Sequence, residues 1–157
     1  MARVLVVGCG CRGRSLAAAL RADGHVVRGT TRSADRLAAI EAAGLEGVVA
    51  EPDRLGTIMG QLAGVTVVCW LMGTANGAPE LHGPRLETLL ERLVDTPVRG
   101  IVYEAAGSVD AGLLAGGAAA VRAAAQRWRM PAEVVEAQPA EHAAWLAAMH
   151  AAVGRLL

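Results

Sequence analysis

Three glycines near the N-terminus constrain the fold of this chain more than any other feature of its sequence. Gly8, Gly10 and Gly13 have the spacing G-x-G-x-x-G. They directly follow the apolar run Arg3–Val7, whose β-branched residues predict a strand buried on both faces. The next segment, Ser15–Ala22, has the apolar spacing of a helix. A glycine-rich turn between a strand and a helix predicts the first half of a β-α-β unit.

Strands and helices alternate along the rest of the chain, with short connections. Further strands are predicted at His25–Arg28, Gly47–Ala50, Val65–Leu71, Val98–Tyr103 and Glu133–Glu136. Further helices are predicted between the N-cap Ser33 and Gly44, and at Leu55–Leu62, Glu80–Leu93, Leu113–Trp128 and Glu141–Leu156. This alternation is typical of an α/β protein with a parallel sheet covered by helices on both faces. We therefore expect residues 1–157 to form a single Rossmann-type domain, a doubly wound sheet of about six strands without a separate substrate domain.

The composition excludes several classes of function. The chain has 15 basic and 15 acidic residues, and this balance argues against a nucleic-acid or membrane-surface protein. Every basic residue is arginine, so a Schiff-base lysine, a Walker lysine and a Tyr–Lys proton relay are all excluded. No apolar run approaches the roughly 20 residues of a membrane helix. We expect a cytoplasmic protein that does not contact membranes.

The cysteines and histidines predict neither a disulfide framework nor a metal site. Cys9, Cys11 and Cys69 are odd in number and lack C-x-x-C spacing, which is typical of a reduced protein. Cys9 and Cys69 fall near strand ends, where a thiol beside a helix N-terminus can have a depressed pKa and sense redox state. The alternative is that they are small core residues. His142 and His150 lack a third ligand.

The glycine-rich turn predicts a dinucleotide as the partner. In a β-α-β unit, Gly8 makes the tight turn, Gly10 allows close approach of the pyrophosphate, and Gly13 lets helix and strand pack closely. The start of the following helix, with Cys11 and Arg12, offers free N–H groups and the positive end of the helix dipole to the phosphates. The alternative is a glycine turn without a ligand.

The end of the second predicted strand favours NADP(H) over NAD(H). An NAD site places Asp or Glu there, roughly 20 residues after the glycines. Here the sequence is Thr30, Thr31, Arg32 and Ser33, without a carboxylate. Hydroxyl and guanidinium donors suit a 2′-phosphate, and Arg12 could reach the same phosphate from the glycine loop. The alternative is that both arginines are solvated charges.

Further site residues are expected at the ends of the third, fourth and fifth strands. Asp53 could accept a hydrogen bond from the adenine amino group, or it could be a loop or N-cap residue. The crevice beyond the fourth and fifth strands should hold the nicotinamide and substrate, lined in part by Leu71, Met72 and Gly73. The candidate acid–base residues there are few, and a lone His or Tyr at such positions is more often structural: Tyr103, Glu104 and His82.

With these residues placed, the chain resembles the extended and atypical short-chain dehydrogenases/reductases, in particular epimerase/dehydratase-like and NmrA-like NAD(P)-binding proteins. The likeness is carried by Val4–Gly13, Asp23–Val27, Gly29–Ser33 and Glu51–Asp53. The resemblance implies an NAD(P)-binding Rossmann fold and oxidoreductase chemistry. It also implies a homodimer in which the helices Glu80–Leu93 and Leu113–Trp128 pair across a two-fold axis.

The sequence departs from that family in three respects. The family's Tyr-x-x-x-Lys pair is absent, since the corresponding helix begins Gly112–Gly117 and no lysine exists. We expect no C-terminal substrate-binding extension of the kind that extended members have. The family's common glycine spacing is G-x-x-G-x-x-G, so a cofactor domain like that of 6-phosphogluconate dehydrogenase remains an alternative.

Two functions remain open. One is an NADPH-dependent oxidoreductase that needs little acid–base help, acting on acceptors such as flavins or quinones. The other is a non-catalytic NADP(H)-binding module that senses redox state through an unknown protein partner.

Overall fold

The computed structural model describes the whole chain, residues 1–157, and its centre is one parallel sheet of six strands. The strands are β1 (Arg3–Val7), β2 (Val26–Thr31), β3 (Glu46–Val49), β4 (Val65–Trp70), β5 (Gly100–Glu104) and β6 (Ala132–Val135). Their order across the sheet is β3-β2-β1-β4-β5-β6. The chain order reverses between β1 and β4, so the crevice at a topological switch point lies above these two strands. The expected α/β fold of Rossmann type is confirmed.

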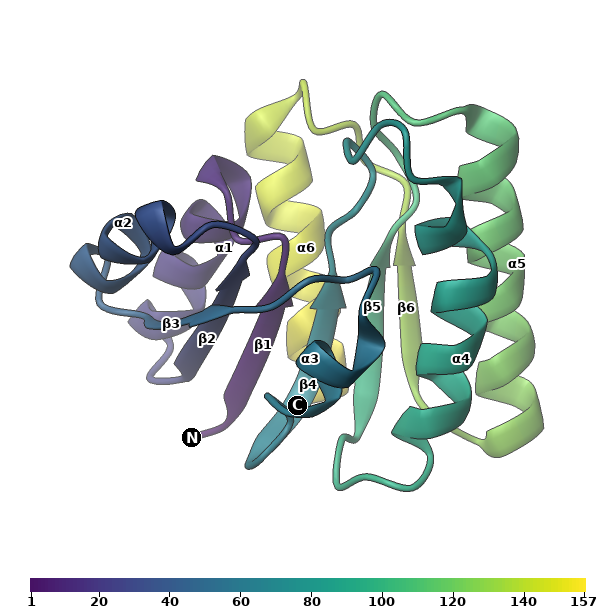
Figure 1. Ribbon diagram of the computed structural model, residues 1–157, viewed down its shortest axis with the longest axis horizontal. Helices are drawn as coiled ribbons and strands as arrows, with labels where there is room; N and C mark the ends of the chain where they lie inside the picture. The colour runs from purple at the N-terminus through teal and green to yellow at the C-terminus, as the bar shows by residue number, and fades with distance from the viewer.

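Helices cover both faces of the sheet (Figure 1). One face carries α1 (Cys11–Ala22), α2 (Leu37–Ala42) and α6 (His142–Leu156), and the other carries α3 (Leu55–Met59), α4 (Pro84–Leu93) and α5 (Ala111–Trp128). All strand pairs are parallel, so the loops that follow the strands lie along one edge of the sheet. None of the helices combines the length and the apolarity needed to cross a membrane.

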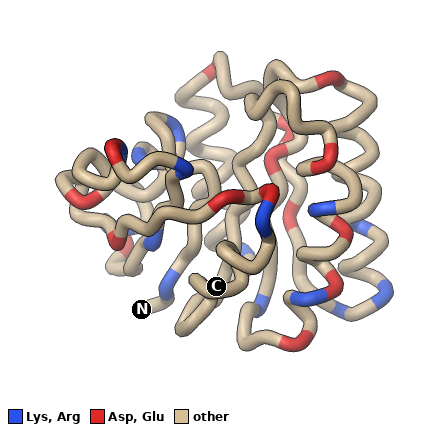
Figure 2. The backbone as a smooth tube through the Cα atoms, viewed as in Figure 1, with Lys and Arg blue, Asp and Glu red and all other residues tan.

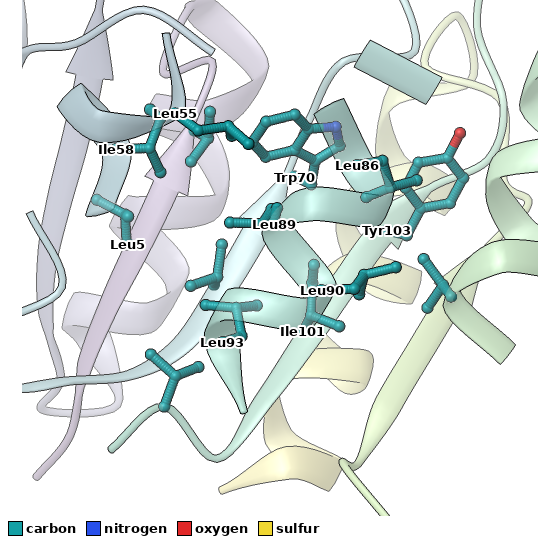
Figure 3. Packing of buried hydrophobic residues seen from close by; sticks show 14 of the residues in the cluster. Leu5, Leu55, Ile58, Trp70, Leu86, Leu89, Leu90, Leu93, Ile101 and Tyr103 are labelled. Carbon is teal, nitrogen blue, oxygen red and sulfur yellow. The ribbon is translucent and has the colours of Figure 1, made fainter. Parts of the chain in front are cut away.

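Each face of the sheet has its own hydrophobic core, because successive side chains of a strand point to opposite sides. Val4 and Val6 of β1 pack toward α1 and α6, whereas Leu5 and Val7 pack toward α3 and α4. Figure 3 shows the second core, in which Trp70 and Tyr103 lie among the leucines of α4. Strands β4 and β5, which carry Trp70 and Tyr103, are therefore held firmly in the core up to their carboxyl ends.

The glycine-rich turn is shorter than expected, and the second strand is longer. Helix α1 begins at Cys11, four residues before the predicted start, because the turn is complete at Gly10. Strand β2 continues to Thr31, since it pairs with β3 as far as Thr31 and Val49. Thr30 and Thr31 therefore belong to the strand and not to the loop beyond it.

The helix predicted at Glu80–Leu93 is interrupted. The structure has a 3-10 turn at Pro79–His82, and α4 starts only at Pro84. Pro84 has no N–H to continue a helix, and it disfavours helical geometry in the residue before it. Gly83 accordingly has φ −130° and ψ −111°. The break turns His82 into the core.

Candidate functional site

A cleft of about 450 Å³ opens at the carboxyl ends of β1, β2 and β4, above the switch point. Its lining combines the glycine turn, the end of β2 and the loop after β4: Gly8, Cys9, Gly10, Arg12, Arg14, Thr30, Thr31, Arg32, Ser33, Arg36, Leu71, Met72, Thr74 and Ala75. The lining includes four arginines and no carboxylate. Figure 2 shows basic positions gathered over the ends of β1 and β2. The cleft is therefore built to receive an anion.

The glycine turn has the geometry that close approach of a phosphate requires. Gly8 has φ +88°, and a Cβ there would lie 2.7 Å from the carbonyl oxygen of Leu71. A Cβ on Gly10 would meet nothing within 4 Å, so the turn is open toward the cleft at this residue. A Cβ on Gly13 would lie 3.1 Å from the carbonyl oxygen of Gly8, so α1 packs closely against the turn. These are the positions predicted for the three glycines.

The first turn of α1 leaves its donors free. No side chain caps the helix at Gly10, and the backbone N–H groups of Cys11, Arg12 and Gly13 make no backbone hydrogen bond. Unpaired N–H groups at a helix N-terminus, together with the helix dipole, favour a bound anion. The glycine turn and this first helical turn form one continuous binding surface.

Thr30 supports the turn from beneath. Its hydroxyl accepts a hydrogen bond from the N–H of Gly8 at 3.2 Å, and its carbonyl accepts one from the N–H of Cys9 at 3.0 Å. The residue is almost fully buried. Thr30 therefore positions the glycine turn; it also lines the cleft, and its predicted role as a phosphate donor stays a prediction.

The end of β2 presents the exposed cationic wall of the cleft. Arg32 and Arg36 are exposed and form no ion pair, and the half-buried Arg14 of α1 forms none either. The Thr31 hydroxyl donates to the carbonyl oxygen of Ser33 and accepts from its backbone N–H. The Ser33 hydroxyl accepts from the N–H of Asp35. Arg36 and Arg14 were not predicted. Arg36 could have been found, because it follows the N-cap Ser33 by one helical turn and lies four residues from Arg32.

Arg12 does not lie with these arginines. Its Nη2 donates to Oε1 of Glu104 at 2.8 Å, its Nε donates to Oε2 at 3.2 Å, and its Nη1 donates to the hydroxyl of Thr74 at 3.1 Å. Strands β2 and β5 are separated by β1 and β4, a distance of about 14 Å at the usual strand spacing. The guanidinium of Arg12 is thus held on the β5 side, and the expectation that it reaches the 2′-phosphate is not supported by this arrangement.

Glu104 is completely buried at the end of β5 and is surrounded by donors. Besides Arg12, the N–H of Gly73 donates to Oε1 and the indole N–H of Trp145 donates to Oε2, both at 2.8 Å. Its side chain is not exposed to the cleft. Glu104 therefore links α1, the β4 loop and α6, and it does not face a substrate.

Tyr103 and His82 form a second buried pair on the opposite side of the sheet. The Tyr103 hydroxyl lies 2.6 Å from Nδ1 of His82, whose Nε2 lies 3.0 Å from the carbonyl oxygen of Met72. Burial raises the pKa of Tyr103 above its ordinary value, and the Glu104 carboxylate raises it further. Burial lowers the pKa of His82, against smaller opposing effects of Met72 and Glu104. Neither side chain lines the cleft.

The loops that follow β4 and β5 close against each other. The N–H of Val109 donates to the carbonyl oxygen of Gly73 at 3.0 Å, and the Ser108 hydroxyl donates to the side chain of Asn76 at 3.1 Å. A Cβ on Gly73 or Gly107 would overlap the facing backbone. Of the predicted crevice residues, Leu71 and Met72 line the cleft, whereas Gly73 is buried in this contact and no residue of the β5 loop reaches the cleft.

Asp53 lies outside the cleft lining, in the turn after β3. Its Oδ1 is buried and has no hydrogen-bond partner. A buried carboxylate oxygen without a donor is costly, so this atom has an unused capacity to accept. No group of three His, Cys, Asp or Glu side chains is arranged to hold a metal ion.

The buried cysteines do not have the properties of redox sensors. Burial raises the pKa of Cys9 to about 11 and that of Cys69 to about 12. The hypothesis of a depressed pKa at Cys9 is therefore wrong, because desolvation by burial outweighs the opposing effect of the nearby Arg14. Cys9 packs against Gly29, where a Cβ would lie 2.6 Å from its sulfur. Cys11 is exposed.

Comparison with known proteins finds similarity only at the level of the fold. No protein-family model matches the sequence, and comparison with curated proteins gives no match either. Among solved structures, the chain is similar to UDP-N-acetylglucosamine 4-epimerase from Bacillus cereus, with a TM-score of 0.66, 15% identity and coverage of 87% of this chain and 53% of that one.

Two reductases show the same degree of similarity. The triphenylmethane reductase of Citrobacter sp., complexed with NADP(H), gives a TM-score of 0.67 at 16% identity, covering 85% of this chain and 48% of that one. Vestitone reductase from alfalfa (Medicago sativa L.) gives 0.66 at 15% identity, covering 87% and 56%. The chain thus spans about half the length of each of the three enzymes. At 15–16% identity these likenesses show the fold alone: the chain has the α/β fold of an epimerase and of two reductases, one of them solved with NADP(H).

Proposed function

We propose that this protein binds NADP(H) in the cleft above β1, β2 and β4. The observation that carries the proposal is the wall at the end of β2, where Arg32 and Arg36 are exposed, form no ion pair and adjoin the hydroxyls of Thr31 and Ser33. A 2′-phosphate prefers guanidinium and hydroxyl donors, whereas the ribose of NAD prefers a carboxylate at this place. The cleft lining contains no carboxylate.

With the 2′-phosphate placed at the end of β2, the positions of the other parts of the dinucleotide can be proposed. Its diphosphate lies against the glycine turn, where Gly10 leaves space and the first N–H groups of α1 are unpaired. Its adenine extends toward the turn after β3; Asp53 lies in this turn, but its Oδ1 is buried outside the cleft lining, so the proposal does not rest on it. Its nicotinamide half extends toward Leu71, Met72, Thr74 and Ala75.

The positions of the acid–base candidates favour hydride transfer in which no side chain of the protein donates or accepts a proton. Tyr103, His82 and Glu104 are all buried, hydrogen-bonded to other protein groups and absent from the cleft lining. An acceptor that carries its own electron sink, such as a flavin or a quinone, needs no such group. We propose an NADPH-dependent reductase for acceptors of this class.

A second candidate function is a non-catalytic NADP(H)-binding module that acts through a protein partner. One observation favours it: the loops after β4 and β5 meet at Gly73 and Gly107, in the place where a substrate would approach the nicotinamide. A binding module requires no open substrate site at that edge.

Two measurements separate these functions. Calorimetric titration with NADPH and NADH tests dinucleotide binding, and binding of neither would exclude both candidates. NADPH oxidation is then followed spectrophotometrically with a panel of flavins, quinones and aldehydes. Turnover with flavins or quinones supports the reductase, whereas tight binding without turnover on any acceptor leaves the module.

A further inference from the structure

The guanidinium of Arg12 is fixed in place but not fully used by the protein. Three of its N–H donors are engaged, two by Glu104 and one by Thr74. A guanidinium has five such donors, so two remain without a protein partner. The side chain keeps 24% of its surface exposed and lines the cleft beside Gly8 and Gly10. The Arg12 guanidinium therefore lies next to the glycine turn with two N–H donors that no protein group uses.

We infer that Arg12 binds the diphosphate of the dinucleotide and that Glu104 is the positioning residue that holds its guanidinium there. This inference rests on the proposed function and adds the residues that recognise the diphosphate. Arg32 and Arg36 recognise the 2′-phosphate at the other end of the cleft. Arg12 thus serves the diphosphate, and Arg32 and Arg36 serve the 2′-phosphate.

The surroundings of Glu104 explain why the guanidinium cannot move away easily. A buried carboxylate is costly unless donors compensate its charge. Gly73 and Trp145 supply two of these donors from the β4 loop and from α6, and both are themselves buried. The indole ring of Trp145 also lies beneath the guanidinium, with Cζ 5.5 Å from the ring centroid. Displacing Arg12 would leave the Glu104 carboxylate without its countercharge.

The position of Arg12 separates this role from recognition of the 2′-phosphate. Its guanidinium is held toward β5, whereas Arg32 and Arg36 follow β2 on the other side of the switch point. The glycine turn lies between them, at the end of β1. A diphosphate seated on this turn would contact Arg12 from one side, while the adenosine half extends over β2.

Three probes test the assignment, because each carries a different set of phosphates. ADP has the diphosphate only, adenosine 2′-monophosphate has the 2′-phosphate only, and NADPH has both. Calorimetry of the wild-type protein is compared with Arg12→Ala and with Arg32→Ala. Arg12→Ala should weaken ADP and NADPH about tenfold to a hundredfold, the effect of losing charged hydrogen bonds. It should leave adenosine 2′-monophosphate binding unchanged.

Arg32→Ala should give the reverse pattern, weakening adenosine 2′-monophosphate and NADPH but not ADP. Equal losses of ADP and adenosine 2′-monophosphate in Arg12→Ala would overturn the inference while leaving the proposed function in place. Unchanged binding of all three probes would overturn it as well. A wild-type protein that binds none of the probes would instead contradict the proposed function itself.

Because Arg12→Ala leaves Glu104 uncompensated, it could fail to fold. The double variant Arg12→Met/Glu104→Gln removes both charges together and keeps an amide oxygen as acceptor for the buried donors of Gly73 and Trp145. We expect it to lose ADP binding and keep adenosine 2′-monophosphate binding. If the double variant folds and binds ADP as the wild type does, the inference is wrong.

Glu104→Gln tests positioning separately from contact. It retains Arg12 but replaces one acceptor oxygen with a donor, so the guanidinium loses its bidentate partner. The expected result is a lower ratio of ADP affinity to adenosine 2′-monophosphate affinity, partly restored in Glu104→Asp. A merely structural ion pair would leave that ratio unchanged, even if the variant were less stable.

Discussion

The hydroxyl of Tyr103 lies 2.6 Å from Nδ1 of His82, and both side chains are buried between the sheet and the helices α4 and α5. The other ring nitrogen of His82 faces the carbonyl oxygen of Met72 at 3.0 Å. The geometry fits a neutral imidazole that donates from Nε2 and accepts at Nδ1 from the tyrosine hydroxyl. The pair joins β5 to the 3-10 turn that precedes α4.

Tyr103→Phe should destabilise the protein without weakening its dinucleotide binding. The substitution leaves Nδ1 of His82 without a donor, which costs about 1–3 kcal/mol for a buried polar group. Neither residue lines the cleft, so NADPH affinity should stay at the wild-type value. Urea unfolding and calorimetry measure the two quantities. Unchanged stability with lost NADPH binding would place Tyr103 in the site instead.

The free energy of unfolding should fall as the pH drops below the ordinary histidine pKa of 6.5. Burial lowers the pKa of folded His82, so the unfolded state binds more protons than the folded state in this range. His82→Gln provides the control, because an amide can form both hydrogen bonds and does not titrate. Its unfolding free energy should change less between about pH 7 and pH 5. Parallel pH profiles for the two proteins would contradict the assignment.

Gly117→Ala should destabilise the protein by about 1–3 kcal/mol, the usual cost of overpacking a core. A Cβ at this position would overlap the hydroxyl and ring of Tyr103. The neighbouring Gly116 offers a matched control, because a Cβ there meets nothing within 4 Å. Gly116→Ala should therefore stabilise α5 by up to about 1 kcal/mol. Thermal unfolding of both variants distinguishes them, and similar effects at the two sites would contradict the packing described.

Iodoacetamide should alkylate the native protein mainly at Cys11. Cys11 is exposed, whereas Cys9 and Cys69 are buried with pKa values raised to about 11 and about 12. A thiol reacts as its thiolate, so both burial and the raised pKa slow the reaction. Mass spectrometry of the labelled peptides measures the three rates. Labelling of Cys9 as fast as that of Cys11 would revive the redox hypothesis for this residue.

The parts of the fold and site that the sequence predicts are those that depend on local pattern. The strand Arg3–Val7 was predicted with the bounds that β1 has, and the three glycines take the places expected of them. Alternating strands and helices determine a parallel sheet almost by themselves. The sequence also located one wall of the cleft, since Thr31, Arg32 and Ser33 all line it.

What the sequence does not reveal concerns residues whose surroundings depend on distant partners. Arg12 was assigned to the 2′-phosphate because no local pattern reveals that Glu104, 92 positions away, binds it. Thr30 lines the cleft as expected, but the sequence did not reveal that its hydroxyl and carbonyl also hold the glycine turn. The break before α4 was predictable, because Gly83 and Pro84 disfavour a continuous helix.

The ratio of NADPH affinity to NADH affinity, measured by calorimetry, tests the central claim most directly. Wild-type protein should prefer NADPH, and Arg32→Ala/Arg36→Ala should lower the ratio by about tenfold or more, because charged donors to the 2′-phosphate are lost. Arg85→Ala, an exposed arginine on α4 away from the cleft, should leave it unchanged. A wild-type ratio near one, or a ratio that the double variant does not change, would contradict the proposed NADP(H) site.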